Sequence, residues 1–323
     1  MMKFKNRGVV LISILMIVLL LSAIAITFGN KYLVALKRAQ FIEFQSLSLN
    51  AFRNVEALSL NKIDKSLRFN SNNITKENPL IKDEIFFEIN GAKIVGSIDD
   101  ASNCFNINSL VIKNKDDYQE NKKSINALRE LLYLTEVDNN IIEEIIDQTI
   151  DWIDTNSNPR AYGLEDYYYS GPLHSPREFS ASRLLINIEE LKSIPSVRLV
   201  DWKIFDHLFC AYPFASNLKL NINTLDKTNI LLLTSFFPMI DIKDAEYIID
   251  NIPLDGFRDI NTFLQTFNDI DLSSPYGEVL FTSDIFTVKT VIEYEGYSAS
   301  SESTLIYGKN KNGYILSRTY NGI

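Results

Sequence analysis

Histidine and cysteine are scarce in this chain, with two of each among 323 residues. So little cysteine excludes a disulfide framework and a thiolate zinc site, and so little histidine leaves almost no histidine-based metal or acid–base chemistry. Glycine and proline, at 12 and 9 residues, are too few for a collagen-like or low-complexity chain. Basic charge is also short, because 32 basic against 41 acidic residues give a net charge of −9. The chain therefore lacks the electropositive surface that nucleic-acid-binding proteins use.

A long apolar run stands near the N-terminus. Residues 9–28 contain no ionisable side chain, and at about 1.5 Å per residue they can span a hydrocarbon core of roughly 30 Å. Lys3, Lys5 and Arg7 precede the run, and the positive-inside rule predicts that this end is cytoplasmic. Apolar residues then recur at helical spacing to about residue 66. A cleaved signal peptide has no reason to merge into an amphipathic helix, so we predict a retained single-pass anchor.

The junction before the apolar run resembles a prepilin leader. The sequence reads KNRG and then VVLIS, so that Gly8 directly precedes Val9. In pilin-like proteins a dedicated prepilin peptidase cuts after this glycine and leaves the apolar helix attached. The resemblance implies removal of residues 1–8, which would change the net charge from −9 to −12. Most such proteins carry glutamate five residues after the cut, where this chain has Ser13.

Strand patterns occupy both ends of the remaining chain. Residues 84–110 and residues 279–323 alternate apolar with polar side chains. Each region holds an Asn-Gly pair, at Asn90-Gly91 and at Asn312-Gly313, and such pairs are typical of tight hairpin turns. These segments predict an antiparallel β domain that is built from two distant parts of the sequence.

The middle of the chain, residues 111–278, is helical by its apolar spacing. Ser124 is the expected N-cap of one helix, and residues 140–153 are expected to form another. A short phrase occurs twice, as NINSL at residues 106–110 and as NINTL at residues 221–225, and the hydroxyl residue of each is expected to cap the next helix. We therefore predict an α+β fold, in which the β domain is interrupted by an inserted α-helical domain.

One segment holds most of the excess acidic charge. Residues 136–166 contain nine acidic side chains and a single basic one, Arg160. Asp147, Asp151 and Asp154 are spaced to lie on one helix face, where like charges are mutually destabilising. This local acidity indicates a demand for a neutralising cation.

The loop after this helix has oxygen-bearing side chains at alternating positions. They lie at Asp154, Asn156 and Asn158, with Glu165 at the twelfth position, which is how an EF-hand surrounds calcium. Pro159 stands where an EF-hand requires glycine, so we expect a calcium loop of another geometry. Spacing alone leaves two interpretations open, a calcium site and a solvated acidic helix end.

The motif DWID, followed by a polar loop, GLED and a later IEEL, resembles the protein K family, the large minor pseudopilins of type II secretion systems. The resemblance implies a pilin-like sheet and a sterile-alpha-motif-like helical insert, with its second half at about residues 220–278. It implies calcium binding by the following residues: Asp151, Asp154, Asn156, Glu165 and Asp166. It also implies a protein of the inner membrane, with its bulk in the periplasm, that caps the pseudopilus tip and helps to start its assembly. The implied partners are the minor pseudopilins I and J, with H as a further candidate.

Two other functions stay open at this point. A membrane-anchored periplasmic hydrolase would use the acidic loop as a carboxylate pair, but no nucleophilic triad or glycine-rich phosphate loop accompanies it, and we expect no enzyme. A minor pilin of a type IV or competence system would share the leader without the DWID and GLED motifs. Cys104 and Cys210 are expected either to form a disulfide in an oxidising periplasm or to be two separately buried thiols.

Overall fold

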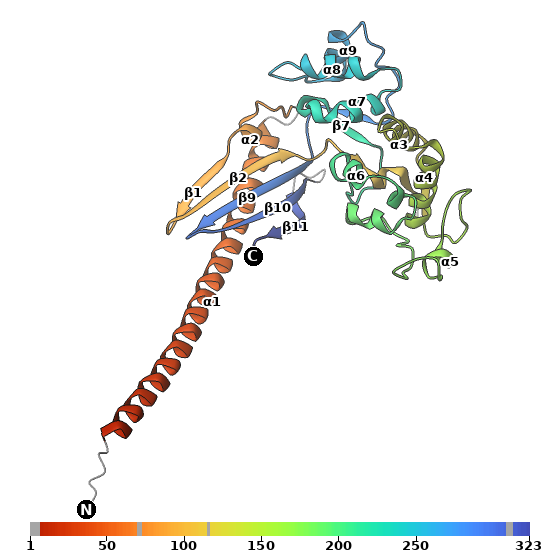
Figure 1. Ribbon diagram of the computed structural model, residues 1–323. Coiled ribbons are helices and arrows are strands. Elements are labelled where there is room, and N and C mark those ends of the chain that lie inside the picture. Colours follow the sequence, from red (N-terminus) through yellow and green to blue (C-terminus); the bar gives the residue numbers. More distant parts are fainter. Residues whose placement is uncertain (1–6, 70–72, 115–116, 308–312) are drawn as a thin grey trace, which may run out of the picture.

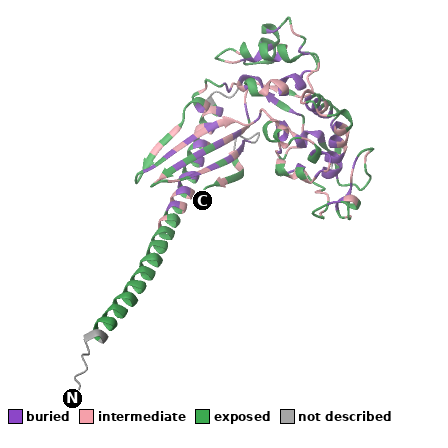
Figure 2. Cartoon of the chain, viewed as in Figure 1, coloured by how far each residue is buried: buried purple, intermediate pink, exposed green. Residues whose placement is uncertain are grey.

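The chain begins with one long helix in the computed structural model, which describes residues 7–69, 73–114, 117–307 and 313–323. Helix α1 (Arg7–Phe69) has 63 residues, or about 95 Å at 1.5 Å per residue (Figure 1). In this described part of the chain it is the one helix long and apolar enough to cross a membrane, and its apolar N-terminal half is exposed (Figure 2). Gly8 and Val9 lie in its first turns, residues 1–6 lie outside the described residues, and cleavage of the leader stays a prediction.

The C-terminal half of α1 packs on an antiparallel sheet (Figure 1). The sheet has five strands in the order β1-β2-β9-β10-β11, so the two distant regions predicted to form it do lie side by side. A single helical turn, α2 (Pro79–Lys82), precedes the first strand. The strands are β1 (Ile85–Ile89), β2 (Ala92–Asp100), β9 (Ile285–Tyr294), β10 (Tyr297–Tyr307) and β11 (Gly313–Asn321). Asn90 and Gly91 form the predicted turn with φ angles of 51° and 81°, whereas Asn312 lies outside the described residues.

The core of the β domain lies between α1 and the strands. Val55 of α1 is fully buried, and a Cβ placed on Gly96 of β2 would lie 2.6 Å from Val55 Cγ1, so the helix can approach this strand closely only at a glycine. The buried carboxylate of Glu56 accepts hydrogen bonds from Arg318 Nε at 2.8 Å, from Arg318 Nη2 at 2.9 Å and from the Ser303 hydroxyl. These contacts join α1 to the last two strands.

The helical domain is inserted between β2 and β9 and lies at one end of the sheet (Figure 1). Its first half runs from β3 (Phe105–Asn106) to β6 (Phe209–Cys210), which pair in parallel. Between them lie η1 (Ile107–Leu110), β4 (Val111–Asn114), β5 (Asp117–Glu120), α3 (Lys122–Leu134), α4 (Asn139–Ile153), α5 (Asp166–Tyr169), η2 (Ile188–Ser193), η3 (Val197–Leu199) and α6 (Trp202–Leu208).

The second half runs from β7 (Lys219–Asn221) to β8 (Glu278–Leu280), again paired in parallel. It contains η4 (Ile222–Thr224), η5 (Lys227–Asn229), α7 (Ile230–Phe236), α8 (Ile242–Asp250) and α9 (Ile260–Thr266). Because β3 and β8 pair only within the insert among the described residues, the insert reaches beyond the predicted bounds of 111 and 278 at both ends.

The repeated phrase NIN has the same structural role in both halves. The second asparagine of each phrase forms hydrogen bonds with both the backbone N–H and the backbone carbonyl of one residue in a distant segment. Asn108 accepts a hydrogen bond from the N–H of Leu185 and donates to its carbonyl, both at 2.8 Å. Asn223 does the same with Phe257, at 2.7 and 2.8 Å. The two halves are therefore built on one plan.

The predicted helix caps differ from the observed ones. In both phrases the cap is the first asparagine, Asn106 or Asn221, whose side chain accepts a hydrogen bond from the backbone N–H two residues later. The prediction that Ser109 and Thr224 cap the next helix is wrong, because both lie inside the 3₁₀ turns, and the following elements α3 and η5 have Asn121 and Asp226 at their N-cap positions. Helix α3 also begins at Lys122, two residues before the predicted cap Ser124.

Cys104 and Cys210 form a disulfide, with their Cα atoms 5.8 Å apart. The parallel pairing of β3 with β6 brings the two residues together across 106 positions of sequence. The disulfide thus joins the beginning of the first helical half to its end, and the alternative of two separate thiols does not hold.

Candidate functional site

The acidic segment forms α4 and the loop that follows it, on the far side of the insert from the sheet (Figure 1). Helix α4 buries its isoleucine face in the insert core, and Asp138 caps its N-terminus by accepting a hydrogen bond from Asn140 N at 2.8 Å. In the first half, residues 154–184 connect α4 to Leu185, the residue that Asn108 binds. In the second half, residues 251–256 alone connect α8 to Phe257, the residue that Asn223 binds. The acidic loop is therefore an insertion in a plan that works without it.

Three carboxylates of this segment are buried together. The exposed fraction is 0% for Asp151, 5% for Asp154 and 3% for Glu165. Oδ1 of Asp151 and Oε1 of Glu165 have no hydrogen-bond partner within the described residues. Burying carboxylate oxygens that have no hydrogen bond costs free energy of folding, so we expect a neutralising group at this site.

The pKa shifts of the three carboxyl groups also indicate a missing positive charge. Burial raises the pKa of Asp151 to about 6 and that of Glu165 to about 7, and it also raises the pKa of Asp154. The negative charges of Asp151 and Asp154 raise the pKa of Glu165 further, which places the three groups within electrostatic reach of one another. Their common environment therefore disfavours the charged forms unless a cation is present.

One arginine supplies part of the missing positive charge. The guanidinium of Arg160 lies 3.0 Å from Glu120, 3.9 Å from Asp147 and 3.7 Å from Asp151 Oδ1. The backbone N–H of Arg160 also donates to Asp151 Oδ2 at 3.0 Å. Arg160 thus lies close to both carboxylate oxygens of Asp151, and no ion pair connects it to Glu165 in the part of the chain described.

A glycine lets the loop close over Asp151. A Cβ on Gly163 would lie 1.8 Å from Asp151 Oδ2 and 2.9 Å from the backbone nitrogen of Arg160. No larger residue fits there without movement of the carboxylate or the backbone. The glycine of the GLED motif is the sequence signal for this contact, although spacing arguments did not assign it a role.

The other two predicted ligands lie at the edge of the site. Asn156 is exposed, and its side-chain oxygen accepts a hydrogen bond from Asn158 N at 2.8 Å. Asp166 is exposed as well, and its Oδ1 accepts hydrogen bonds from the backbone and the hydroxyl of Ser180 at 2.8 and 2.7 Å. The predicted set therefore divides into three buried carboxylates and two outer residues that shape the loop.

Aromatic side chains close one side of the site. Trp152 and Tyr169 are buried and meet edge to face, with ring centroids 4.9 Å apart. Tyr167, on the same short helix α5, is 64% exposed and takes no part in this contact.

The residues present fit a calcium ion better than a transition metal. Among the described residues, no three His, Cys, Asp or Glu side chains are arranged so that they could hold a metal ion by themselves. Calcium, however, also takes amide, backbone and water oxygens, and the carboxylate oxygens of Asp151 and Glu165 that lack a hydrogen bond are hard ligands of the kind it prefers. The site offers no sulfur or imidazole ligand among its predicted members.

Comparison with known proteins agrees with the fold. Residues 103–214 match the family model described as type II secretion system protein K. A type II secretion system protein K of Aeromonas hydrophila is 23% identical over 98% of both chains, and a putative one of Escherichia coli K12 is 24% identical over 81% of this chain and 80% of its own. The GspK–GspI–GspJ complex from enterotoxigenic Escherichia coli contains a chain with the same fold, with a TM-score of 0.72 and 22% identity over 88% of this chain and 99% of that one. The chain is thus similar to type II secretion system protein K, through the family model over residues 103–214 and through the Aeromonas hydrophila relative over nearly its whole length.

Proposed function

We propose that this chain is the minor pseudopilin that caps the periplasmic tip of the pseudopilus and helps to start its assembly for protein export. The related protein of enterotoxigenic Escherichia coli was solved in a complex with GspI and GspJ. By the same fold, the partners of this chain would be the corresponding subunits I and J.

The observation that carries the tip position is the place of the insert. The exposed apolar half of α1 leaves the sheet at one end, and the helical insert lies at the other (Figure 1). Pilin-like subunits pack in a fibre through such helices, so their sheets and loops must stack above one another. An insert that begins near Phe105 and ends near Leu280 would meet the subunit above it, and only a terminal subunit escapes this clash.

The membrane topology follows from the same helix. The exposed apolar stretch of α1 would lie in the inner membrane before assembly, with Lys3, Lys5 and Arg7 on the cytoplasmic side. Cleavage between Gly8 and Val9 by a prepilin peptidase would then leave the helix free to enter the fibre.

Labelling of fibres tests the tip position. A small epitope tag in the exposed loop at Leu254 of the full chain should give one label at one end of each fibre by immunoelectron microscopy. The matched control is the same tag on the major fibre subunit, which should label the whole length. Labels of this chain spread along the fibre would overturn the proposal.

We also propose that the acidic site binds calcium. Asp151, Asp154 and Glu165 would supply the inner carboxylate ligands, and Asn156 and Asp166 the outer oxygens. A bound calcium ion would supply the positive charge that offsets the mutual repulsion of these groups. In this interpretation the chain's own residues position the ligands: Gly163 allows the loop to close, and Trp152 excludes water from one side.

Thermal unfolding tests the calcium proposal. Because an ion that binds only the folded state stabilises it, calcium at 100 times its dissociation constant should add about 2.7 kcal/mol, and chelator should remove it. Asp151→Asn should lose this response, whereas Asp206→Asn, at an exposed position outside the site, should keep it. A melting temperature that changes neither with calcium nor with chelator would contradict calcium binding. Hydrolytic activity lost in Asp151→Asn with an intact fold would favour the hydrolase instead.

A further inference from the structure

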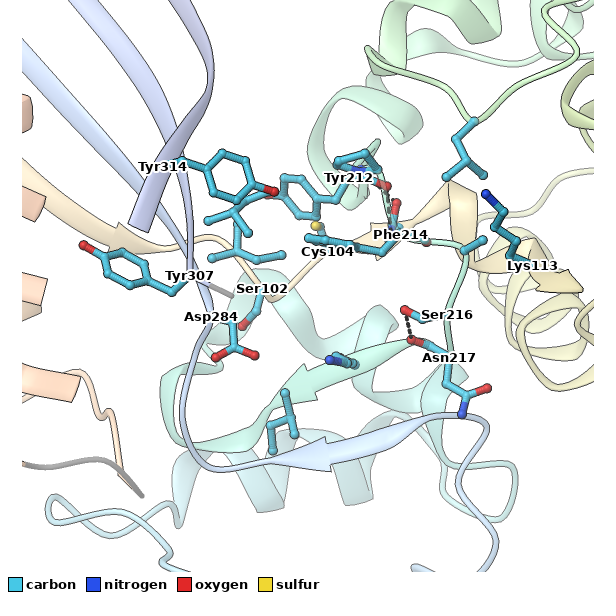
Figure 3. Close-up of a pocket in the computed structure, with 18 of the residues that line it drawn as sticks. Ser102, Cys104, Lys113, Tyr212, Phe214, Ser216, Asn217, Asp284, Tyr307 and Tyr314 are labelled. Carbon is cyan, nitrogen blue, oxygen red and sulfur yellow. Dashed lines mark hydrogen bonds between the residues drawn. The ribbon is translucent and has the colours of Figure 1, made fainter. Parts of the chain in front are cut away.

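A cavity of about 560 Å³ lies at the junction of the sheet and the helical insert (Figure 3). Tyr307, Tyr314 and Asp284 line it on the sheet side. The segment that joins β6 to β7 lines it on the insert side, with Tyr212 and Phe214. This volume lies within the usual range of ligand sites, which is about 300–1,000 Å³. The acidic site shares none of these residues.

The aromatic walls are fixed in place by the chain itself. The hydroxyl of Tyr212 donates to the carbonyl of Ala101 at 2.8 Å, and the hydroxyl of Tyr307 donates to the carbonyl of Leu60 at 2.9 Å. Because both hydroxyls are engaged with backbone, both rings are held in fixed orientations. Tyr307 is 4% exposed and belongs to the β-domain core, so Tyr212, Phe214 and Tyr314 supply the accessible aromatic surface of the cavity. A ligand would therefore meet a preformed surface and lose little free energy in ordering it.

The segment that joins β6 to β7 is fixed just as firmly. Asn106 accepts a hydrogen bond from Tyr212 N at 3.0 Å, and Asn108 donates to the carbonyl of Tyr212 at 2.8 Å. The disulfide of Cys104 and Cys210 holds the base of the same segment. Two asparagines and a disulfide thus hold a short connection that forms one wall of a cavity.

The charged groups of the cavity favour an anion. Lys113 and Lys219 line it together with one carboxylate, Asp284. Lys219 lies within electrostatic reach of Asp284, whereas Lys113 forms no ion pair with any described residue. The cavity thus has an excess of one positive charge in a chain whose net charge is −9.

We propose that this cavity binds a partner polypeptide through an apolar side chain that is followed by a carboxylate, as at a C-terminal phenylalanine or leucine. The aromatic walls would enclose the side chain, and Lys113 and Lys219 would pair with the carboxylate. The junction of sheet and insert, where the lining residues lie, is at the end of the sheet away from the apolar half of α1 (Figure 1). This distance from the apolar stretch favours a polypeptide over the membrane as the source of the ligand. A bound segment would contact the sheet and the insert at once and would hold them together. This proposal does not depend on the tip position.

Binding of a labelled peptide to the full chain in lipid nanodiscs tests the proposal. The probe is a fluorescent hexapeptide that ends in Leu-Phe with a free carboxylate, measured by anisotropy against empty nanodiscs. We expect saturable one-to-one binding, and a loss of at least about tenfold in affinity when the terminal carboxylate is amidated.

Charge reversals of the two lysines provide the matched variants. Lys113→Glu and Lys219→Glu should each weaken binding about tenfold, because each replaces an attraction by a repulsion. Lys243→Glu, on exposed α8, is the control and should bind as the parent does. Both cavity lysines are exposed, so the variants should fold.

The proposal would be overturned by the absence of saturable binding, by equal binding of the acid and the amide, or by equal binding to the parent and all the lysine variants. Stronger competition by dodecanoate than by the unlabelled peptide would also overturn it, because the ligand would then be a fatty acid. Labelling of the fibre end is unaffected by any of these results, so the tip position and the peptide site can fail separately.

Discussion

At the scale of single residues, Gly163 has the tightest contact in the acidic site. A Cβ there would lie 1.8 Å from Asp151 Oδ2, so Gly163→Ala must displace either the carboxylate or the loop. We expect the free energy of unfolding to fall by about 1–3 kcal/mol and the response to calcium to weaken. Urea unfolding with calcium and with chelator measures both. Gly29→Ala is the control, since nothing lies within 4 Å of that position. A Gly163→Ala protein as stable and as calcium-responsive as the parent would show that the loop does not close here.

The stability of the calcium-free protein should depend on pH at these carboxylates. Burial raises the pKa of Asp151 from 3.8 to about 6 and that of Glu165 from 4.5 to about 7. A carboxyl group whose pKa is raised by folding stabilises the folded state while it is protonated, and this contribution is lost as the pH rises through the folded-state pKa. We therefore expect stability in chelator to fall between about pH 4 and pH 7, by on the order of 2–3 kcal/mol for each group.

Urea midpoints across this pH range, with chelator and with calcium, measure the effect. Calcium should offset the loss at neutral pH, where the carboxylates are free to bind it. Glu165→Gln should show a smaller loss in chelator, because one of the two titrating groups is absent. A midpoint in chelator that rises steadily over the same range would contradict the assigned environment.

The candidate site was predictable from the sequence in part. Regular spacing placed Asp151 and Asp154 on one helix face, and the GLED motif added Glu165. Spacing could not indicate that Asn156 and Asp166 face outward, because that depends on how the loop folds back on α4. Nor could it pair Arg160 with Glu120, which lies forty positions earlier in the chain.

At the scale of elements, the disulfide holds the first helical half together. It closes a loop across 106 positions of sequence, and constraining the unfolded chain over about 100 residues contributes about 4.7 kcal/mol in the chain-entropy model. The double variant Cys104→Ser/Cys210→Ser should therefore unfold at a clearly lower urea concentration than the oxidised parent. The parent in reductant should resemble the variant. Equal midpoints for all three samples would show that the pairing of β3 with β6 is stable without the bond.

Element types were more predictable than element ends. The apolar period of α4 and the Asn-Gly turn of β1 and β2 are local signals, and both appear in the structure. The twofold phrase NIN is also local, but its role is not, because Asn108 and Asn223 each bind a residue far along the chain. A cap prediction based on the hydroxyl that follows them is wrong for that reason: the asparagines are the structural residues of the phrase.

At the scale of the whole molecule, the arrangement depends on how α1 is joined to the sheet. If the chain assembles through α1 as proposed, the sheet and the insert follow the helix only while it stays docked on the strands. The apolar contacts of the core are not directional, whereas the bidentate pair of Glu56 and Arg318 fixes the helix in register with β11. Glu56 is 3% exposed, so loss of the arginine would leave a buried carboxylate without its ion-pair partner.

Arg318→Met should therefore destabilise the docked helix. Breaking a fully buried ion pair costs about 3–5 kcal/mol, and we expect less here because the Arg318 side chain is 41% exposed. The double variant Glu56→Met/Arg318→Met should recover much of the loss, since it leaves no unpaired buried charge.

The surface pair of Lys289 and Asp99, with side chains 55% and 46% exposed, is the matched control, and its removal should cost no more than about 1 kcal/mol. Urea unfolding of the four proteins measures these differences. A double variant no more stable than Arg318→Met would mean that the arginine contributes by packing against α1, and that Glu56 is satisfied by Ser303 and solvent alone.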